Sequence, residues 1–483
     1  MIFNSVTFII FLFIVVGLYW VLPSKPRQLL LFTSSLIFYG FWRYEYTLIM
    51  LASAINDYFI SLLIHKTKDP KKRKSLLLFS LFVNLGFLFY FKYLLFFAEN
   101  AVSVINLFGF NIDQPSFSIL LPLGISFYTF QTISYTVDVY RGFIKPQKNF
   151  ILYGSYVTFF PQLVAGPILR AQEVIYQLKI RARFQIKFIN DGIIRILFGL
   201  FLKVVITDNI APIVDQIYSV PVAGLSAIDV WVKAFLFGFQ IYFDFSAYSH
   251  IAIGAAKLMG ISFPENFNYP YLAISFKSFW KRWHISLSSW IRDYLYLPIL
   301  GVKVMDKSTG GLSTEMPKAS NANRALFLTW AIMGLWHGAS WAFVFWGAYH
   351  ASLIFIERKL TIITRKINKN IRSILGWGIT LPLAMLSWLP FRENNLSDVF
   401  IMFKKLFIIN GFFNRSFSEN TYLITALLLI LTIISFLIHK YLLEKIKKNL
   451  LLYSAILVIT VSFLTILDLT FLRPISQFIY FQF

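Results

Sequence analysis

The sequence has no cysteine among its 483 residues and few charged residues, which make up 14% of the chain. The lack of cysteine excludes disulfides, thiolate metal sites and a cysteine nucleophile. Soluble domains have roughly a quarter of their residues charged and about half apolar. The low charged fraction and a hydrophobic fraction of 58% therefore indicate an integral membrane protein.

Several enzyme motifs are also missing. The chain has no G-x-S-x-G elbow, no H-E-x-x-H zinc helix, no Walker loop and no G-x-G-x-x-G fingerprint. These absences argue against a serine hydrolase, a zinc hydrolase and an ATP-driven transporter. We expect no metal site and no bound cofactor.

The charge that is present is strongly basic, with a net value of +23. The basic residues cluster in short loops between apolar runs, as the positive-inside bias of membrane proteins requires. No basic stripe interleaves with aromatic residues in a way that would follow a phosphate backbone. We therefore expect membrane lipid, and no nucleic acid, around this protein.

Apolar runs of about 20 residues recur along the chain and predict an all-α polytopic membrane protein. The first run is followed, not preceded, by Lys25 and Arg27, so we interpret it as a retained span and not a cleaved signal peptide. Residues 1–483 are expected to form a single transmembrane domain, with a core over about 1–360 and further spans within about 373–472. The basic clusters place both termini on the periplasmic side. The C-terminal elements expected are spans over 373–391, 421–439 and 450–472, with an amphipathic stretch over 398–413.

Two segments do not fit a simple count of spans. The Pro- and Gly-containing stretch 159–167 lies between cytoplasmic-type basic residues, which is typical of a re-entrant segment. Arg324 and Arg358 have too few residues between them for two full spans, so a short helical pair or a broken helix is expected there. Irregular backbone at membrane depth must be buried in protein or line a cavity.

Polar residues inside apolar segments are the candidate site residues, because an ionisable group in a membrane costs several kcal/mol unless it is paired (~2.5 or more). His337 lies in IMGLWHGASW, where Gly334 and Gly338 would allow close approach to the ring and Trp336 and Trp341 would form walls. A neutral imidazole there could act as a general base. His284 lies in FWKRWHISLSSWIRDYLY, which is either a membrane-surface anchor or a helix bordering a site for an anionic substrate.

The same segments resemble the membrane-bound O-acyltransferase (MBOAT) family, and within it the bacterial AlgI-like branch. The resemblance is carried by LPLGISFYTFQTISYTVDVYRG, FPQLVAGPI, IYFDFSAYSHIAIG, FWKRWHISLSSWIRDYLYLP and GLWHGASWAFVFWGAYH. It implies a helical shield with re-entrant segments and a central tunnel. Carried over by position, the catalytic histidines are His337 and His284. Substitutions at Ala247, His250, Lys281 and Met333 depart from the branch pattern and leave the acceptor open.

The function that this resemblance implies is membrane O-acetyl transfer from cytoplasmic acetyl-CoA across the inner membrane. The acceptor would be an exopolysaccharide such as alginate, or peptidoglycan, reached through a periplasmic SGNH-type partner. Two alternatives are D-alanyl transfer from a carrier protein to teichoic acid and, in another class, a glycan-precursor transporter. General-base and acyl-histidine mechanisms both remain open. The candidate substrate-binding residues are Trp336, Trp283, Arg282, Lys281, Asp244, Gln131 and Asp138.

Overall fold

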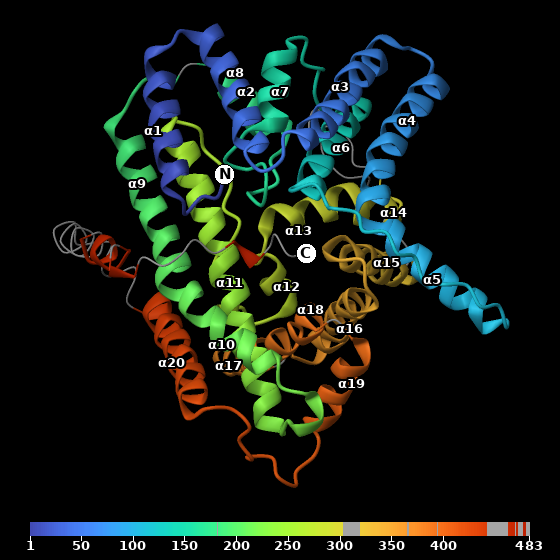
Figure 1. The fold of residues 1–483 in the computed structure, drawn as a ribbon, viewed down its shortest axis with the longest axis vertical. Coiled ribbons are helices and arrows are strands. Elements are labelled where there is room, and N and C mark those ends of the chain that lie inside the picture. The colour runs from blue at the N-terminus through green and yellow to red at the C-terminus, as the bar shows by residue number, and fades with distance from the viewer. Residues whose placement is uncertain are drawn as a thin grey trace. The chain divides into compact units, whose positions relative to one another are not determined.

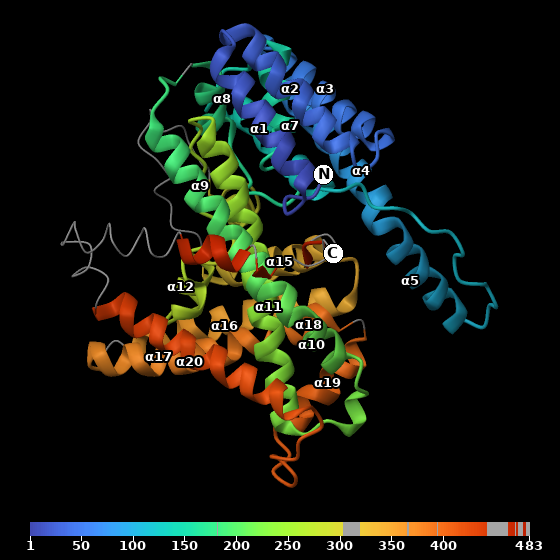
Figure 2. The same ribbon diagram turned by 60° about the vertical axis from the view of Figure 1, so that its left-hand side comes forward.

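The structure is a computed structural model that describes residues 1–180, 182–302, 319–364, 367–393, 395–441, 462–468, 470–471 and 477–479. All regular secondary structure in these residues is helical (Figures 1 and 2). This confirms the predicted all-α class. Most of the predicted span 450–472 lies outside the described residues.

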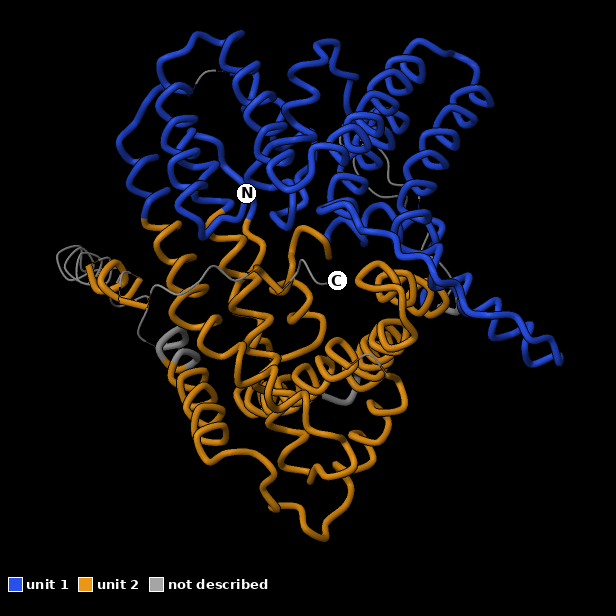
Figure 3. The backbone as a smooth tube through the Cα atoms, viewed as in Figure 1, with its two compact units in different colours: residues 1–193, 252–264, 289–322 blue, residues 194–251, 265–288, 323–483 orange. Residues whose placement is uncertain are grey.

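The chain forms two compact units, each built from segments distant in sequence (Figure 3). Unit 1 comprises residues 1–193, 252–264 and 289–322, and unit 2 comprises 194–251, 265–288 and 323–483. Helices α9 (Ile186–Leu200), α11 (Ala227–Leu258), α13 (Ile285–Ile291) and α15 (Ala319–His337) contribute residues to both.

Unit 1 is built mainly from the N-terminal helices, among which α3 packs against α4 and α6, and α2 against α7 (Figure 1). Its polar core is centred on Asp57 of α3, which accepts hydrogen bonds from Ser80 (2.5 Å) and Asn84 (2.9 Å) of α4. The helices of this unit are α1 (Val6–Val21), α2 (Ser24–Gly40), α3 (Glu45–Lys66), α4 (Pro70–Leu88), α5 (Leu94–Leu107), α6 (Ile125–Arg141), α7 (Phe150–Thr158), α8 (Ala171–Lys179) and α14 (Leu297–Leu300).

Unit 2 is organised around α16, which packs against α12, α18 and α19. A π-helical segment, Phe201–Thr207, precedes α10. The remaining helices of the unit are α10 (Asp208–Tyr218), α12 (Phe276–Trp280), α15 (Ala319–His337), α16 (Trp341–Thr364), α17 (Lys369–Leu386), α18 (Leu389–Arg392), α19 (Leu396–Lys405) and α20 (Glu419–Tyr441).

The outer surfaces of the helices are strongly apolar. On α1, Phe13 is 81% exposed and Val21 is 78% exposed. Soluble proteins rarely expose contiguous apolar surface of this kind, so the solvent for these faces is lipid. Among the residues that the structure describes, three helical segments are long and apolar enough to cross a membrane, namely Glu45–Lys66, Pro70–Leu107 and Lys369–Arg392. The last of these contains the span predicted over 373–391.

Both predicted irregular segments are interrupted as expected. Helix α7 ends at Thr158, and the chain through 159–169 is non-helical yet buried inside unit 1. Helices α15 and α16 are separated by a break at residues 338–340. The break between Arg324 and Arg358 therefore falls directly after His337. This places the imidazole at the end of a helix and not in the middle of one.

Candidate functional site

His337 is the last residue of α15, and aromatic side chains from three helices surround its buried ring. The ring centroids of Trp336, Trp346 and Phe391 lie 4.8, 4.9 and 5.1 Å from that of His337. Trp346 belongs to α16 and Phe391 to α18. Segments far apart in the sequence thus build the walls around this imidazole.

The sequence interpretation of the residues flanking His337 is partly wrong. A Cβ at Gly334 would meet the backbone of Phe343, and one at Gly338 would meet the Phe343 ring. The glycines therefore allow α15 and α16 to approach each other, and they do not open a path to the imidazole. Trp336 does form a wall, but Trp341 is 55% exposed, and the second indole beside the ring is that of Trp346.

His284 lies between two short helices, α12 and α13, and is 1% exposed. Its backbone φ of +42° is in the left-handed region, which a residue other than glycine seldom occupies. Its Nδ1 lies 3.0 Å from Oδ1 of Asn266. The neighbouring Trp283 and Trp280 are also buried. The membrane-surface anchor considered for this segment is therefore wrong, because its tryptophans and His284 point into the protein.

One indole connects the two histidines. The Trp336 ring is 4.8 Å from the His337 ring and 6.4 Å from the His284 ring. All three residues belong to unit 2. The two imidazoles predicted from the sequence are thus brought to a common aromatic wall, although they are 53 positions apart along the chain. A neutral imidazole is the form that can accept a proton.

A second layer of aromatic residues supports this wall. His350 of α16 is fully buried, and its ring centroid lies 4.8 Å from that of Trp346. Its Nδ1 accepts a hydrogen bond of 3.4 Å from Nε1 of Trp280, and Trp330 stacks on its ring. His350 is the last residue of the motif FWGAYH, but its distance along the chain from His337 and His284 did not predict that it would lie beside the site.

Asp244, one of the candidate substrate-binding residues, is buried and paired with Lys203. Nζ of Lys203 donates to Asp244 at 2.9 Å and forms an ion pair with Asp208 at 3.0 Å. The same ammonium donates to the carbonyl of Gln477, and the backbone N–H of Ile479 donates to the Asp244 carboxylate. These contacts hold the 477–479 segment in unit 2, so this carboxylate already serves a structural role.

The other candidates of unit 2 lie close to His284 in the chain but differ in exposure. Trp283 is buried against Phe267 and Trp388, with ring centroids 5.1 and 4.6 Å away. Arg282 donates to Ser278 (3.3 Å) and to the carbonyl of Asn268 (3.2 Å). Lys281 is exposed. Arg282 and Lys281 are therefore positive charges that solvent can reach next to His284.

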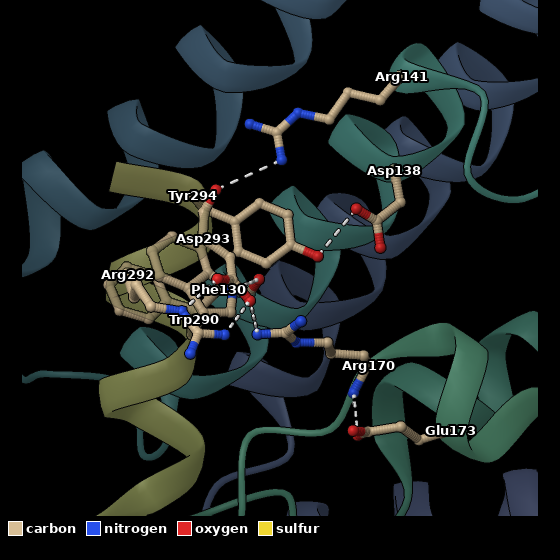
Figure 4. A network of polar contacts seen from close by, with 9 residues as sticks. All are labelled: Phe130, Asp138, Arg141, Arg170, Glu173, Trp290, Arg292, Asp293 and Tyr294. Carbon is tan, nitrogen blue, oxygen red and sulfur yellow. Dashed lines mark hydrogen bonds and ion pairs between the residues drawn. The ribbon is translucent and has the colours of Figure 1, made fainter. Parts of the chain in front are cut away.

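Gln131 and Asp138 belong to unit 1, within α6. Nε2 of Gln131 donates to the carbonyl of Tyr156 at 2.6 Å. Asp138 accepts a 2.9 Å hydrogen bond from the Tyr294 hydroxyl, so its partner is distant in sequence and not the nearby Arg141 (Figure 4).

Tyr294 belongs to a larger polar network, shown in Figure 4. The guanidinium groups of Arg141 and Arg170 lie 5.4 and 5.5 Å from its ring. Asp293 pairs with Arg170 at 2.5 Å and with Arg292 at 2.6 Å. Partial burial raises the pKa of Asp293, but hydrogen bonds and charge from these two arginines outweigh that effect and hold the pKa below its ordinary value.

The geometry supports acid–base chemistry on a hydroxyl group. Two buried imidazoles on one indole can bind and deprotonate a hydroxyl group. Within the described ranges, no three His, Cys, Asp or Glu side chains converge in a way that could hold a metal ion.

The chain is also similar in sequence to known acyltransferases. Residues 145–381 match MBOAT, the membrane-bound O-acyltransferase family. A probable alginate O-acetylase AlgI of Azotobacter vinelandii is 38% identical over 414 residues, which are 84% of this chain and 78% of that protein. A peptidoglycan O-acetyltransferase of Helicobacter pylori is 34% identical over 448 residues, 85% of this chain and 80% of that protein. A teichoic acid D-alanyltransferase of Streptococcus thermophilus is 28% identical over 302 residues, 57% of this chain and 69% of that protein.

Proposed function

The chain belongs to the membrane-bound O-acyltransferase family, and we propose that it transfers acetyl groups from acetyl-CoA to a hydroxyl group of a cell-envelope polysaccharide. That the protein is a membrane O-acyltransferase follows from the family. The donor, the acceptor and transfer across the inner membrane from the cytoplasmic to the periplasmic side are the proposal. Relatives named as alginate and peptidoglycan O-acetylating enzymes support acetyl as the group transferred.

The observation that carries the proposal is the pair of buried imidazoles in contact with Trp336. In the proposed reaction the acceptor hydroxyl attacks the thioester carbonyl, and His337 takes the hydroxyl proton as the new C–O bond forms. The C–S bond of the donor then breaks, and the departing thiolate takes that proton back from the His337 imidazolium to leave as the free thiol of CoA. His284 orients the donor or the reacting group, and Arg282 and Lys281 supply positive charge for the anionic donor.

The chain contains no serine elbow of its own. We therefore propose that a periplasmic SGNH-type acetyltransferase receives the acetyl group and delivers it to the polymer. In that arrangement the hydroxyl that meets the two histidines belongs either to the partner or directly to the polysaccharide. Adding the purified partner to the assay below distinguishes these cases, because only the first requires it.

The test is label transfer from radioactive acetyl-CoA by the purified protein in liposomes. His337→Ala and His284→Ala should each lower the initial rate by about 10²- to 10⁴-fold, the usual contribution of an acid–base group. His65→Ala is the matched control, because His65 is exposed on α3 and should leave the rate unchanged. Wild-type rates in both site variants would overturn the assignment.

The same assay separates the alternatives. A D-alanyl-loaded carrier protein offered in place of acetyl-CoA should give no transfer, whereas a D-alanyltransferase would accept only that donor. A transporter would move glycan precursors without acyl transfer and without dependence on His337. In cells, deleting the gene should remove ester-linked acetate from the envelope polysaccharide.

A further inference from the structure

A short loop clasps the segment that carries His284. The backbone N–H of Asn268 donates to the carbonyl of Arg282, and the N–H of Ile285 donates to the carbonyl of Asn266, both at 2.9 Å. Tyr269 and His284, one on each side of this clasp, have φ values of +45° and +42°. Such backbone persists in a residue other than glycine only where its surroundings hold it, and it concentrates at functional sites.

The side chain of Asn266 lies at the centre of the clasp and is fully buried. Its Oδ1 faces the backbone N–H of Ser286 at 3.4 Å and the Ser286 hydroxyl at 2.9 Å, and its Nδ2 donates to Ser249 at 3.0 Å. Because a backbone N–H can only donate, the amide atom that faces it must be the oxygen. The orientation of the Asn266 amide is therefore fixed by its neighbours.

This orientation determines the tautomer of His284. Nδ1 of His284 lies 3.0 Å from the same Oδ1, and because that oxygen can only accept, Nδ1 must carry the proton. The ring packs against Phe245, with centroids 4.7 Å apart, and against Phe267 at 6.4 Å. This apolar setting favours the neutral imidazole, in which Nε2 then carries the lone pair.

We propose that Asn266 is a positioning residue that locks His284 in the Nδ1–H tautomer and presents its Nε2 as a hydrogen-bond acceptor toward the substrate. The substrate named in this inference rests on the proposed acyl transfer, whereas the tautomer of His284 does not depend on it. The locked tautomer restricts the chemistry of His284. A neutral ring held in this way accepts a hydrogen bond or a proton at Nε2 and does not donate from that atom to an oxyanion.

The first experiment reads the tautomer directly. Nitrogen NMR of the full-length protein, labelled with [¹⁵N]histidine and reconstituted in lipid, should show a His284 signal with a protonated Nδ1 and an unprotonated Nε2. The signal is identified by its loss in His284→Gln. Asn266→Leu, which keeps the size of the side chain but removes the acceptor, should shift the signal toward the other tautomer. A wild-type signal protonated at Nε2 would overturn the proposal.

The second experiment measures kinetics. Asn266→Leu should lower kcat by roughly ten- to a hundredfold with little change in the donor KM, as expected when one buried hydrogen bond that acts on the reacting group is lost. Asn266→Asp retains an acceptor for Nδ1 and should recover at least about tenfold of that loss. Asn268→Leu is the control in the same loop, because the Asn268 side chain is exposed.

The outcomes separate this proposal from the proposed function. A folded Asn266→Leu protein with wild-type kcat would refute the positioning role and leave the acyltransferase assignment in place. An equal loss in Asn266→Leu and Asn266→Asp, with an unchanged tautomer, would show that Asn266 only stabilises the loop. If wild-type protein transferred no acyl group, the proposed function would fail, while the NMR result would still decide the tautomer. If Asn266→Leu did not fold, the wild-type spectrum would serve as the test.

Discussion

The polar groups buried in unit 1 and those around the histidines of unit 2 are held in different ways. In unit 1, Asp293 is paired with Arg170 and Arg292, and Asp138 is bonded to Tyr294 (Figure 4). In unit 2, a neutral amide holds His284, and aromatic rings surround His337. Paired charges neutralise one another, whereas a neutral imidazole that donates from Nδ1 to an amide oxygen has its lone pair on Nε2.

Within unit 2 the same contrast recurs between the histidines and the Lys203–Asp244 pair. The pair is buried, and the backbone around 477–479 completes its hydrogen bonds. From the sequence alone, Asp244 and the histidines could not be told apart, because all of them are ionisable groups in apolar segments. The structure separates them by their partners, and the following predictions test that separation.

The largest effect is expected on catalysis. His337→Gln should reduce the initial rate of acetyl transfer by about 10²-fold or more, because glutamine cannot take up the hydroxyl proton. Its melting temperature in detergent should remain near that of the wild type, because the amide can still pack between Trp346 and Phe391. If the variant lost stability in proportion to activity, His337 would instead be a structural residue, like Lys203 and Asp244.

A large effect on stability is expected at the buried ion pair. Lys203→Met would leave the carboxylates of Asp244 and Asp208 without the ammonium that lies between them. Removing one partner of a buried pair typically costs about 3–5 kcal/mol, and a large drop in melting temperature should follow. The control is Arg415→Ala, since Arg415 pairs with Glu419 on the surface and is 60% exposed. Equal melting temperatures in the two variants would contradict the structural role.

A moderate effect is expected where α15 and α16 meet. A methyl group at Gly347 would collide with the backbone carbonyl of Trp330, which cannot move without shifting the helix. Gly347→Ala should destabilise the protein by about 1–3 kcal/mol, as overpacking does. Gly378→Ala is the control, because nothing lies within 4 Å of the position of its added Cβ. An unchanged melting temperature for Gly347→Ala would show that the contact between these helices is looser than described.

The smallest effect is expected at Asp293, whose arginine partners are partly exposed. Because its pKa is depressed in the folded protein, its contribution to stability is present above the ordinary carboxyl pKa of about 4 and is lost as the pH falls through the folded value. Asp293→Asn should therefore lower stability by at most about 1 kcal/mol at pH 7. The difference in melting temperature from the wild type should shrink below about pH 4. A difference that grew on acidification would have the wrong sign for this network.

Local sequence was sufficient for some features of the site. The short interval between Arg324 and Arg358 predicted a short helical pair or a broken helix there, and α15 does end within that interval, at His337. The His284 segment was harder to interpret, because tryptophans mixed with charges are equally typical of a membrane surface. Only the packing of Trp280 and Trp283 into unit 2 decided that question.

The sequence by itself determined that this is a helical membrane protein with two histidines in apolar surroundings, because hydropathy, charge bias and helix breaks are properties of neighbouring residues. Its motifs also placed it in the acyltransferase family. The tertiary structure decided which partner each buried polar group meets. The contacts of Lys203 with Asp244, of Phe391 with His337 and of Asn266 with His284 join segments that are distant in sequence or depend on backbone dihedral angles, which hydropathy and spacing do not specify.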